Sequence, residues 1–279
     1  MISLKRVRRN YIAVAGGIII LFYVSVALVS LVWLPKDPLA INSAEILKPP
    51  SVQSGHLMGT DEFGRDVLSR IMYGSRVSEI IAASATALGA AVGIFMGIWA
   101  GYLGGRWDNL LMRLTDVLFS FPTLLLALFI MAVLGEKTVN VVIAIGIVYI
   151  PQFARISRGS ILAVRGSDYV RAARSLGASR SYVLFRHLLP NILVPIIVQI
   201  SLSLSVAVLL ESALSFLGLG VQPPDPSWGN MLSSARKYMV VAPWTAVFPG
   251  LAIVVLVLGF NLLGDGLRDL LDPRLRHVT

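Results

Sequence analysis

The chain has 279 residues, of which 56% are apolar and only 14% are charged, and its mean hydropathy is +0.78. Because about a quarter of the residues in an ordinary soluble domain are charged, this composition indicates an integral membrane protein. Cysteine is absent, which excludes disulfides, thiolate metal sites, iron–sulfur clusters and a cysteine nucleophile. Lys and Arg outnumber Asp and Glu by 24 to 15, an excess that membrane proteins concentrate in cytoplasmic loops. The mass of 30.2 kDa leaves room for about six spans and for no soluble catalytic domain.

Six charge-poor runs are long enough to cross a membrane as helices, since about 20 apolar residues span the hydrocarbon core. They are continuously apolar rather than alternating, which argues against β-strands. The first run lacks a small-residue cleavage site at its end and is interpreted as an uncleaved anchor. We therefore predict an all-α, polytopic membrane protein with six transmembrane helices. The runs are residues 11–34, 80–105, 117–135, 138–154, 191–218 and 238–264.

The basic residues predict the orientation of these spans. If the N-terminus is cytoplasmic, 16 of the 24 Lys and Arg fall on the cytoplasmic side and 8 on the other. The positive-inside bias then places both termini in the cytoplasm. Five of the eight outer residues lie in the single connection 35–76.

Residues 35–76 are too long to be a mere connector. Val67, Ile71 and Gly74 recur at helical spacing opposite charged positions. This pattern predicts a short helix over residues 59–74 that lies at the outer membrane surface; a solvated loop with scattered charges is the alternative.

Residues 155–190 form the longest polar stretch of the chain. Tyr169, Ala173 and Leu176 repeat at helical spacing, and Gly177 can end their helix by adopting a left-handed backbone. A second helix is predicted from Ser179 to Pro190. Two short helices around a glycine form an exposed cytoplasmic knob suited to docking; the alternative is a basic loop that only sets topology.

Two features inside the predicted spans have both a structural and a functional interpretation. Glycine recurs every four residues on the second span, a face that allows close helix packing within the subunit or against a partner; its members are Gly89, Gly93, Gly97 and Gly101. Glu211 lies in the outer third of the fifth span, where an unpaired charge costs a few kcal/mol. We predict that Glu211 and Ser215 contribute to the outer gate of a pathway; the alternative for Glu211 is a neutral or hydrogen-bonded helix residue.

A cytoplasmic signature carries a family resemblance. The pattern Glu-Ala-Ala, three residues, Gly, nine residues, Ile, one residue, Leu-Pro matches this sequence in spacing, with Arg171 in place of Glu and His187 in place of Ile. The matching residues are Arg171, Ala172, Ala173, Gly177, His187, Leu189 and Pro190. Supporting stretches are 59–74, 211–220, 264–269 and 272–274. The chain thus resembles the inner-membrane permeases of binding-protein-dependent ABC importers, specifically the second permease of the dipeptide/oligopeptide/nickel group, in which Arg and His replace these two residues.

The resemblance implies a type I importer permease fold and a complex of several subunits. The partners would be a homologous permease, two cytoplasmic ATPases and an external solute-binding protein, in the inner membrane of a prokaryote. The knob would be the coupling helix, docked on one ATPase. The ATPase-coupling residues would be Tyr169, Arg171, Ala172, Ala173, Leu176, Gly177, Ala178, Leu189 and Pro190.

The resemblance also suggests a division of the chain. Residues 1–34 would be a cytoplasmic tail with the first span, and 35–76 an external segment. Residues 77–266 would be the importer's transmembrane domain, with the coupling region at 164–190, and 267–279 a cytoplasmic tail.

Catalysis by the chain itself has little support. No phosphate-binding loop is present, so ATP and Mg²⁺ would be used by the partner ATPases and no cofactor is expected here. Ser234 and Lys237 match Ser-x-x-Lys without its companion motifs, and the three histidines suggest no metal site. The function that the resemblance implies is import of di- or oligopeptides. A nickel-chelate importer of the same group, or an autonomous carrier or channel, are the alternatives.

Overall fold

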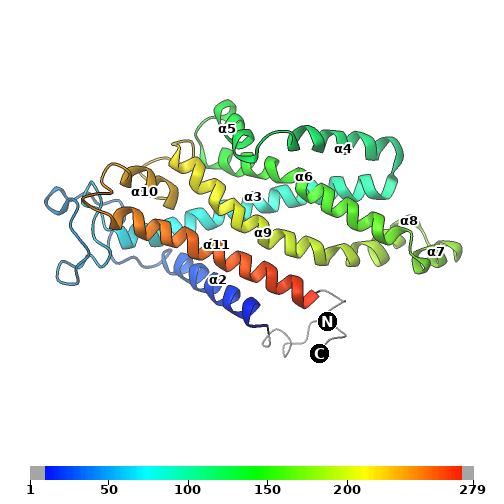
Figure 1. Cartoon of the computed structure of the whole chain (residues 1–279), viewed down its shortest axis with the longest axis horizontal. Helices are drawn as coiled ribbons and strands as arrows, with labels where there is room; N and C mark the ends of the chain where they lie inside the picture. Colours follow the sequence, from blue (N-terminus) through cyan, green and yellow to red (C-terminus); the bar gives the residue numbers. More distant parts are fainter. Residues whose placement is uncertain (1–9, 272–279) are drawn as a thin grey trace.

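The computed structural model describes residues 10–271, and its described part is all-helical (Figure 1). The predicted fold class is therefore confirmed. The basic residues of the N-terminal tail, which contribute to the predicted orientation, lie outside the described residues, and so do the basic residues after position 271. The helices in chain order are α2 (Tyr11–Val29), the short 3₁₀ helix η1 (Ser43–Glu45), α3 (Val67–Leu103), α4 (Gly105–Phe119), α5 (Thr123–Leu134), α6 (Thr138–Arg165), α7 (Asp168–Ser175), α8 (Arg180–Tyr182), the π-helical stretch η2 (Val183–Leu188), α9 (Leu189–Phe216), α10 (Trp228–Ala235) and α11 (Trp244–Leu271).

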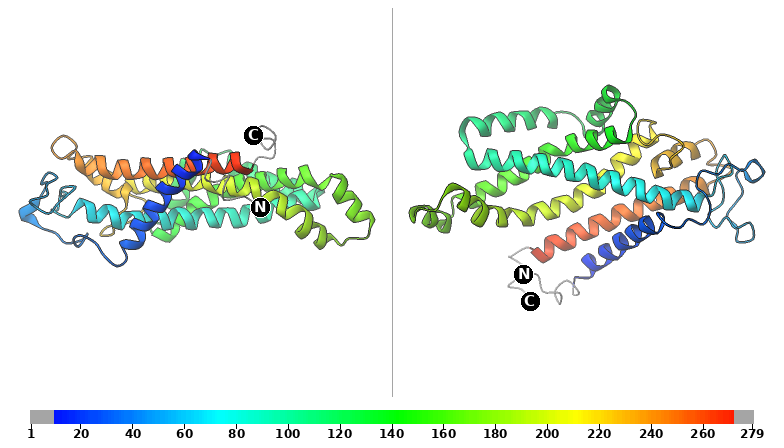
Figure 2. Two further views of the ribbon diagram at one scale, coloured as in Figure 1. Left: turned by 90° about the horizontal axis from the view of Figure 1, so that it is seen from below. Right: turned by 180° about the vertical axis from the view of Figure 1, so that it is seen from behind.

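The long helices lie side by side in one bundle, as the three views in Figures 1 and 2 show. α3 packs along α6 and α9, and α11 lies between α9 and α2. One end of the bundle carries the long segment 35–66 and α10, and the opposite end carries α7 and α8. The start of α2 and the end of α11 lie toward that opposite end. We call residues 35–66 the connecting segment and residues 167–188 the knob.

Within residues 10–271, five helices or continuous helical runs are long and apolar enough to cross a membrane: α2, α3, α6, the run 183–216 and α11. The sixth candidate is the pair α4 and α5, whose axes are bent by 91°. Our prediction of one continuous helix over 117–135 is therefore wrong. The break lies at residues 120–122, where Pro122 lacks a backbone N–H and disfavours helical conformation in the residue before it.

The predicted short helix over 59–74 is also wrong. Asp66 caps α3 by accepting a hydrogen bond from the backbone N–H of Ser69 (2.8 Å), and the helix continues from Val67 to Leu103 without a break. Residues 67–74 are thus the first two turns of a long helix. The apolar positions Val67 and Ile71 are buried, because they face α10 and the rest of the bundle rather than a membrane surface.

The second predicted helix of the knob does not end at Pro190. α8 passes through η2 directly into α9, where Pro190 occupies the first turn. Pro190 has no backbone N–H to donate, and it lies two residues after a π-helical stretch, where the regular α-helical hydrogen-bond pattern is already interrupted. The knob is therefore joined to the span 183–216 without a loop.

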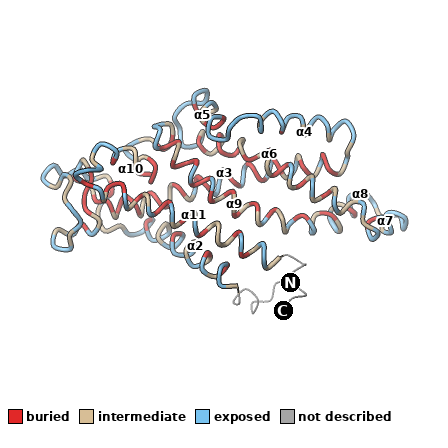
Figure 3. Tube along the Cα trace, viewed as in Figure 1, coloured by how far each residue is buried: buried red, intermediate tan, exposed pale blue. Residues whose placement is uncertain are grey.

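Buried residues concentrate on α3, α6 and α9, whereas α4 is largely exposed (Figure 3). The glycines of α3 explain the close approach of α3 to α6. A Cβ added to Gly89 would lie 2.7 Å from the carbonyl oxygen of Gly146, and one added to Gly97 would lie 2.3 Å from that of Ala154. Gly93 and Gly101 face α6 in the same way. The stripe thus packs within the subunit, the first of its two interpretations.

Candidate functional site

The knob begins with α7, a short amphipathic helix that follows α6 after a two-residue turn. Asp168 lies in its first turn and Arg174 in its last, which complements the helix dipole at both ends. Val170 is fully buried and packs with Ile161 of α6 and Val183 of η2. The buried face of α7 thus fastens the knob to the bundle and leaves the opposite face free.

The turn after α7 depends on Gly177. Its φ is +85°, a left-handed conformation that favours glycine. The N–H of Ala178 donates to the carbonyl of Ala173 (3.0 Å), and the N–H of Gly177 donates to that of Arg174 (3.0 Å). These two bonds are those of a Schellman motif, which ends a helix by redirecting the chain. The predicted role of Gly177 as the end of this helix is confirmed.

An apolar groove lies beside this turn. It has a volume of about 450 Å³, and Ala173, Leu176 and Ala178 are among its lining residues. The Leu176 side chain is 89% exposed, so its apolar surface has no partner within the described chain. Tyr182 and Phe185 are exposed as well, at 53% and 68%. Tyr169 is also exposed. Four large side chains at this end of the bundle therefore face outward: those of Tyr169, Leu176, Tyr182 and Phe185.

Arg171 and His187, the two residues that differ from the general family signature, each have contacts within the knob. Arg171 forms an ion pair with Asp168, and both side chains are largely exposed. The His187 ring lies between the rings of Tyr169 (5.9 Å) and Tyr182 (5.6 Å), measured between centroids. Leu189 is half-buried and Pro190 is exposed at the start of α9. His187 thus packs against both tyrosine rings of the knob.

The end of α6 that supports the knob is tied to its neighbours by basic side chains. Arg158 makes two hydrogen bonds with the Asp108 carboxylate of α4 (2.5 and 2.8 Å). Arg155 pairs with Asp116 (2.6 Å), and Arg165 donates to the carbonyl of Gly101 on α3 (2.8 Å). These contacts join the end of α6 that supports the knob to α3 and α4.

Glu211 and Ser215 lie inside the packed bundle rather than on a surface of this chain. Glu211 is fully buried and Ser215 is 2% exposed. The Glu211 carboxyl accepts hydrogen bonds from Ser78 of α3 (2.9 Å) and from Ser215 (2.8 Å). Ser215 in turn accepts from the N–H of Val221 (3.1 Å). The hydrogen-bonded interpretation of Glu211 matches this geometry, and a role of either residue in an outer gate stays a prediction.

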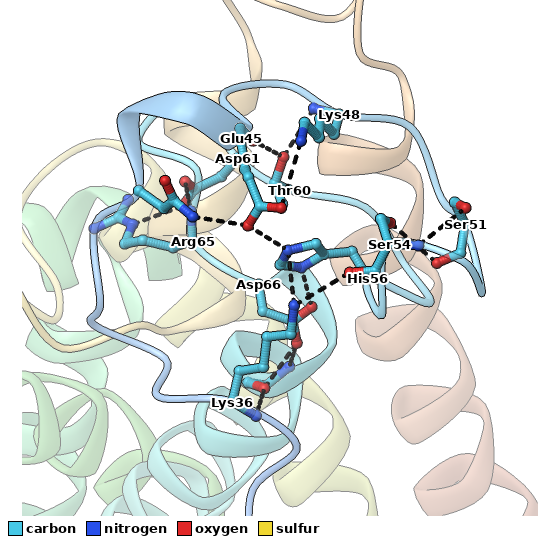
Figure 4. Close-up of polar contacts among 12 residues, drawn as sticks. Lys36, Glu45, Lys48, Ser51, Ser54, His56, Thr60, Asp61, Arg65 and Asp66 are labelled. Atoms are coloured by element: carbon cyan, nitrogen blue, oxygen red, sulfur yellow. Dashed lines mark hydrogen bonds and ion pairs between the residues drawn. The ribbon is translucent and has the colours of Figure 1, made fainter.

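Sequence reasoning missed a polar cluster in the connecting segment (Figure 4). His56 is buried, and its Nδ1 lies 2.9 Å from Asp66, the cap of α3. Its Nε2 lies 2.9 Å from both the Glu45 carboxylate and the Lys36 ammonium. These residues are up to 30 positions apart in sequence, so no local spacing signals the cluster. It gives the connecting segment a fixed structure on top of α3.

The hydrogen bond from His56 lowers the pKa of the Glu45 carboxyl, and the desolvation of that carboxyl opposes this effect. A carboxyl whose pKa is lowered in the folded state stabilises the fold above its unfolded pKa, and this stability is lost as the pH falls through the folded value. We expect Glu45→Gln to lower the melting temperature of the purified protein near neutral pH, and the difference from wild type to shrink below about pH 4.5. Scanning fluorimetry across this range measures it, with Glu136→Gln in an exposed turn as the control. A constant difference at all pH values would contradict the contribution of the Glu45 charge.

Comparison with known proteins adds direct evidence on the family. Residues 93–277 match the family described as binding-protein-dependent transport system inner membrane component. The chain belongs to this family. Residues 2–50 match the N-terminal TM domain of oligopeptide transport permease C, so the resemblance to the second permease of the peptide group is confirmed. The protein is a multi-pass membrane permease component.

Curated relatives align with nearly the whole chain. The dipeptide transport system permease protein DppC of Alkalihalophilus pseudofirmus is 42% identical, over 98% of this chain and 90% of its own length. The glutathione transport system permease proteins GsiD of Pectobacterium atrosepticum and Escherichia coli are 43% and 44% identical, each over 98% of this chain and 90% and 89% of their lengths.

A solved structure agrees with the fold. A chain of the MetNI methionine ABC transporter, in an inward facing conformation, matches with a TM-score of 0.56 at 17% identity. The match covers 71% of this chain and 95% of that chain. The importer permease fold predicted from the sequence is therefore confirmed.

Proposed function

We propose that this permease forms half of the translocation pathway of an ATP-driven importer for di- or oligopeptides. The observation that carries the proposal is the exposed apolar groove of the knob around Leu176 and Gly177. The knob packs against α6 and continues directly into α9. Such a surface suits docking on a soluble partner that changes shape. The peptide class is supported by relatives named for dipeptide and glutathione transport.

The proposed partners follow from this division of labour. Two cytoplasmic ATPases would use ATP and Mg²⁺, and one of them would bind the knob. A homologous permease would complete the pathway, and an external binding protein would deliver the peptide. The coupling residues would be those of the knob signature, from Tyr169 to Pro190. No cofactor would be bound by this chain.

Reconstitution tests the function directly. The four kinds of subunit would be assembled in proteoliposomes with ATP inside and the binding protein outside. We expect uptake of labelled dialanine or glutathione that requires both ATP and the binding protein. Uptake driven by an ion gradient without ATP would instead identify a self-sufficient carrier.

We also propose that the knob and both termini face the cytoplasm and that the connecting segment faces outside. The support is the uneven distribution of Lys and Arg, together with the position of the start of α2 and the end of α11 toward the knob end (Figure 1).

The absence of cysteine allows a labelling test of this topology. A cysteine at Ser54, in the connecting segment, should react with an impermeant maleimide in intact cells. A cysteine at Ser179, in the knob, should react only after the membrane is permeabilised. The reverse pattern would overturn the orientation.

A further inference from the structure

A cavity of about 670 Å³ opens at the end of the bundle that carries the connecting segment. Its walls come from three stretches that are distant in sequence: the connecting segment with the start of α3, the proline-rich loop 218–227, and α10 with the turn that follows it. These stretches meet at the left-hand end of the bundle in Figure 1. The volume is typical of sites for small molecules, which measure about 300–1,000 Å³.

Two of the basic groups in the cavity wall are already neutralised. Asp61 pairs with Arg65 (2.7 Å) and with Arg70 (3.3 Å). Arg65 also lies 3.5 Å from Glu62, and Arg70 donates to the carbonyl of Pro38 (3.1 Å). These cations therefore hold the wall together, and their charges are balanced by neighbouring carboxylates.

Two other charged groups in the lining have no ion-pair partner within residues 10–271. Asp225 accepts only a hydrogen bond from the Tyr73 hydroxyl (3.3 Å), and Lys237 has no polar side-chain contact in this part of the chain. The hydroxyls of Ser233 and Ser234, also in the lining, have no hydrogen-bond partner among the same residues. Among the described residues, the cavity thus offers one carboxylate and one ammonium without an ion-pair partner, and two hydroxyls without a hydrogen-bond partner.

The loop that carries Asp225 is held in place. The Asn230 side chain donates to the carbonyls of Asp225 (2.8 Å) and Val221 (3.3 Å). Ser227 and Asn230 form a capping box at the start of α10. Val221 is tied through Ser215 to the buried Glu211. A ligand that binds here would therefore meet a wall whose ordering costs little.

We propose that this cavity is a receiving site for the peptide in its zwitterionic form. Asp225 would bind the α-ammonium group and Lys237 the terminal carboxylate, while Ser233 and Ser234 would bond to the peptide backbone. Two unpaired charges of opposite sign match a ligand that carries both, and hydrogen bonds between charged groups are the strong ones. The choice of a peptide as the ligand rests on the proposed function.

Protection from alkylation tests this site in the assembled importer. Ser234→Cys places a thiol in the lining of a naturally cysteine-free chain, and its labelling by an impermeant maleimide would be read on this subunit alone. We expect free dialanine, without the binding protein, to slow the labelling. The doubly blocked peptide acetyl-dialanine-amide should need a concentration about a hundred times higher, because it lacks both charges and each charged contact contributes about tenfold. Ser43→Cys, exposed in the connecting segment outside the lining, should be labelled at the same rate with and without peptide.

A charge substitution in the same background tests the assignment of Lys237. Lys237→Gln should raise the protecting concentration of dialanine about tenfold. For dialanine-amide, which has no carboxylate, Lys237→Gln should leave the protecting concentration unchanged. The neighbouring Arg236→Gln, outside the lining, serves as the matched control and should leave protection unchanged.

Two results would overturn the proposal. If dialanine does not slow labelling, or if only the binding protein protects and does so with or without peptide, the cavity is a protein-docking surface or is unused. Uptake of dialanine by the wild-type importer is measured in parallel. Uptake without protection contradicts only the receiving site, whereas absence of ATP-dependent uptake contradicts the proposed function.

Discussion

Gly97→Leu is expected to disrupt assembly of the protein. A Cβ at Gly97 would lie 2.3 Å from the carbonyl oxygen of Ala154 and 2.7 Å from the Cβ of Ser157. Backbone atoms of α6 cannot rotate away as a side chain does, so α3 and α6 would have to separate along their whole contact. Overpacking of this kind costs about 1–3 kcal/mol and occasionally more, and lipid cannot restore the lost helix contacts selectively. The yield of monodisperse protein in detergent, measured by size-exclusion chromatography, should fall sharply. Gly93→Leu should act in the same way, because its Cβ would lie 2.5 Å from the carbonyl oxygen of Ile150.

The matched control is Gly17→Leu. Gly17 also lies in a predicted span, in α2, but a Cβ there would meet no atom within 4 Å. The same gain of volume and hydrophobicity should therefore be tolerated. Equal yields of the Gly97 and Gly17 variants would show that the α3 glycine face is not needed for packing against α6.

The sequence predicts the spanning segments well because their signal is local. A run of about 20 apolar residues has few stable alternatives to a membrane helix. The bend between α4 and α5 shows the limit of this signal. The apolar run 117–135 contains Pro122, but composition alone does not say whether a proline kinks a helix or ends it. The surrounding contacts decide, and here the chain turns by 91°.

In the candidate site too, the sequence predicts the local features but not the contacts between distant segments. Gly177 and the short amphipathic helix before it are visible in the sequence because a helix with its cap is a local structure. The cluster around His56 is not visible, since Lys36, Glu45 and Asp66 meet His56 only after the connecting segment has folded over α3. The cavity near Asp225 likewise needs three distant stretches.

The glycine stripe of α3 is an intermediate case. Its four-residue spacing predicts close contact with some helix, but it does not identify the helix. The identity of the partner, α6, follows from the fold of the whole bundle.

Gly177→Val is expected to uncouple ATP hydrolysis from transport. Gly177 adopts φ +85° with no atom within 4 Å of an added Cβ, so the substitution causes no clash and acts only through the backbone. A left-handed conformation costs an L-residue about 1–2 kcal/mol, and a β-branched side chain adds strain. The turn between α7 and α8 should therefore change its angle. Because Gly177 lies outside the candidate spans, the subunit should still insert. Uptake by the reconstituted importer, and the stimulation of its ATPase by the loaded binding protein, should fall about tenfold or more.

Further substitutions distinguish the effect of the backbone geometry of the knob from the effect of its exposed side chains. Asparagine tolerates the left-handed conformation better than other non-glycine residues, so Gly177→Asn should retain most of the coupling. Leu176→Glu keeps the turn but puts a charge on a side chain that is 89% exposed. It should leave the stability of the isolated subunit within about 0.5 kcal/mol and still weaken ATPase binding, because a charge would enter an apolar contact. Ala172→Glu and Ala173→Glu should act as Leu176→Glu does.

The decisive measurements are the ATPase activity of the reconstituted complex, with and without loaded binding protein, and a pull-down of the ATPases by each variant. A docking surface predicts that Leu176→Glu loses the ATPases, while Gly177→Val retains some binding but responds weakly to the binding protein. Wild-type stimulation in Gly177→Val, Leu176→Glu and both Ala→Glu variants would mean that the knob only sets the topology of a basic loop. The exposed apolar groove would then have to serve another partner, because the Leu176 side chain is 89% exposed and has no partner among residues 10–271.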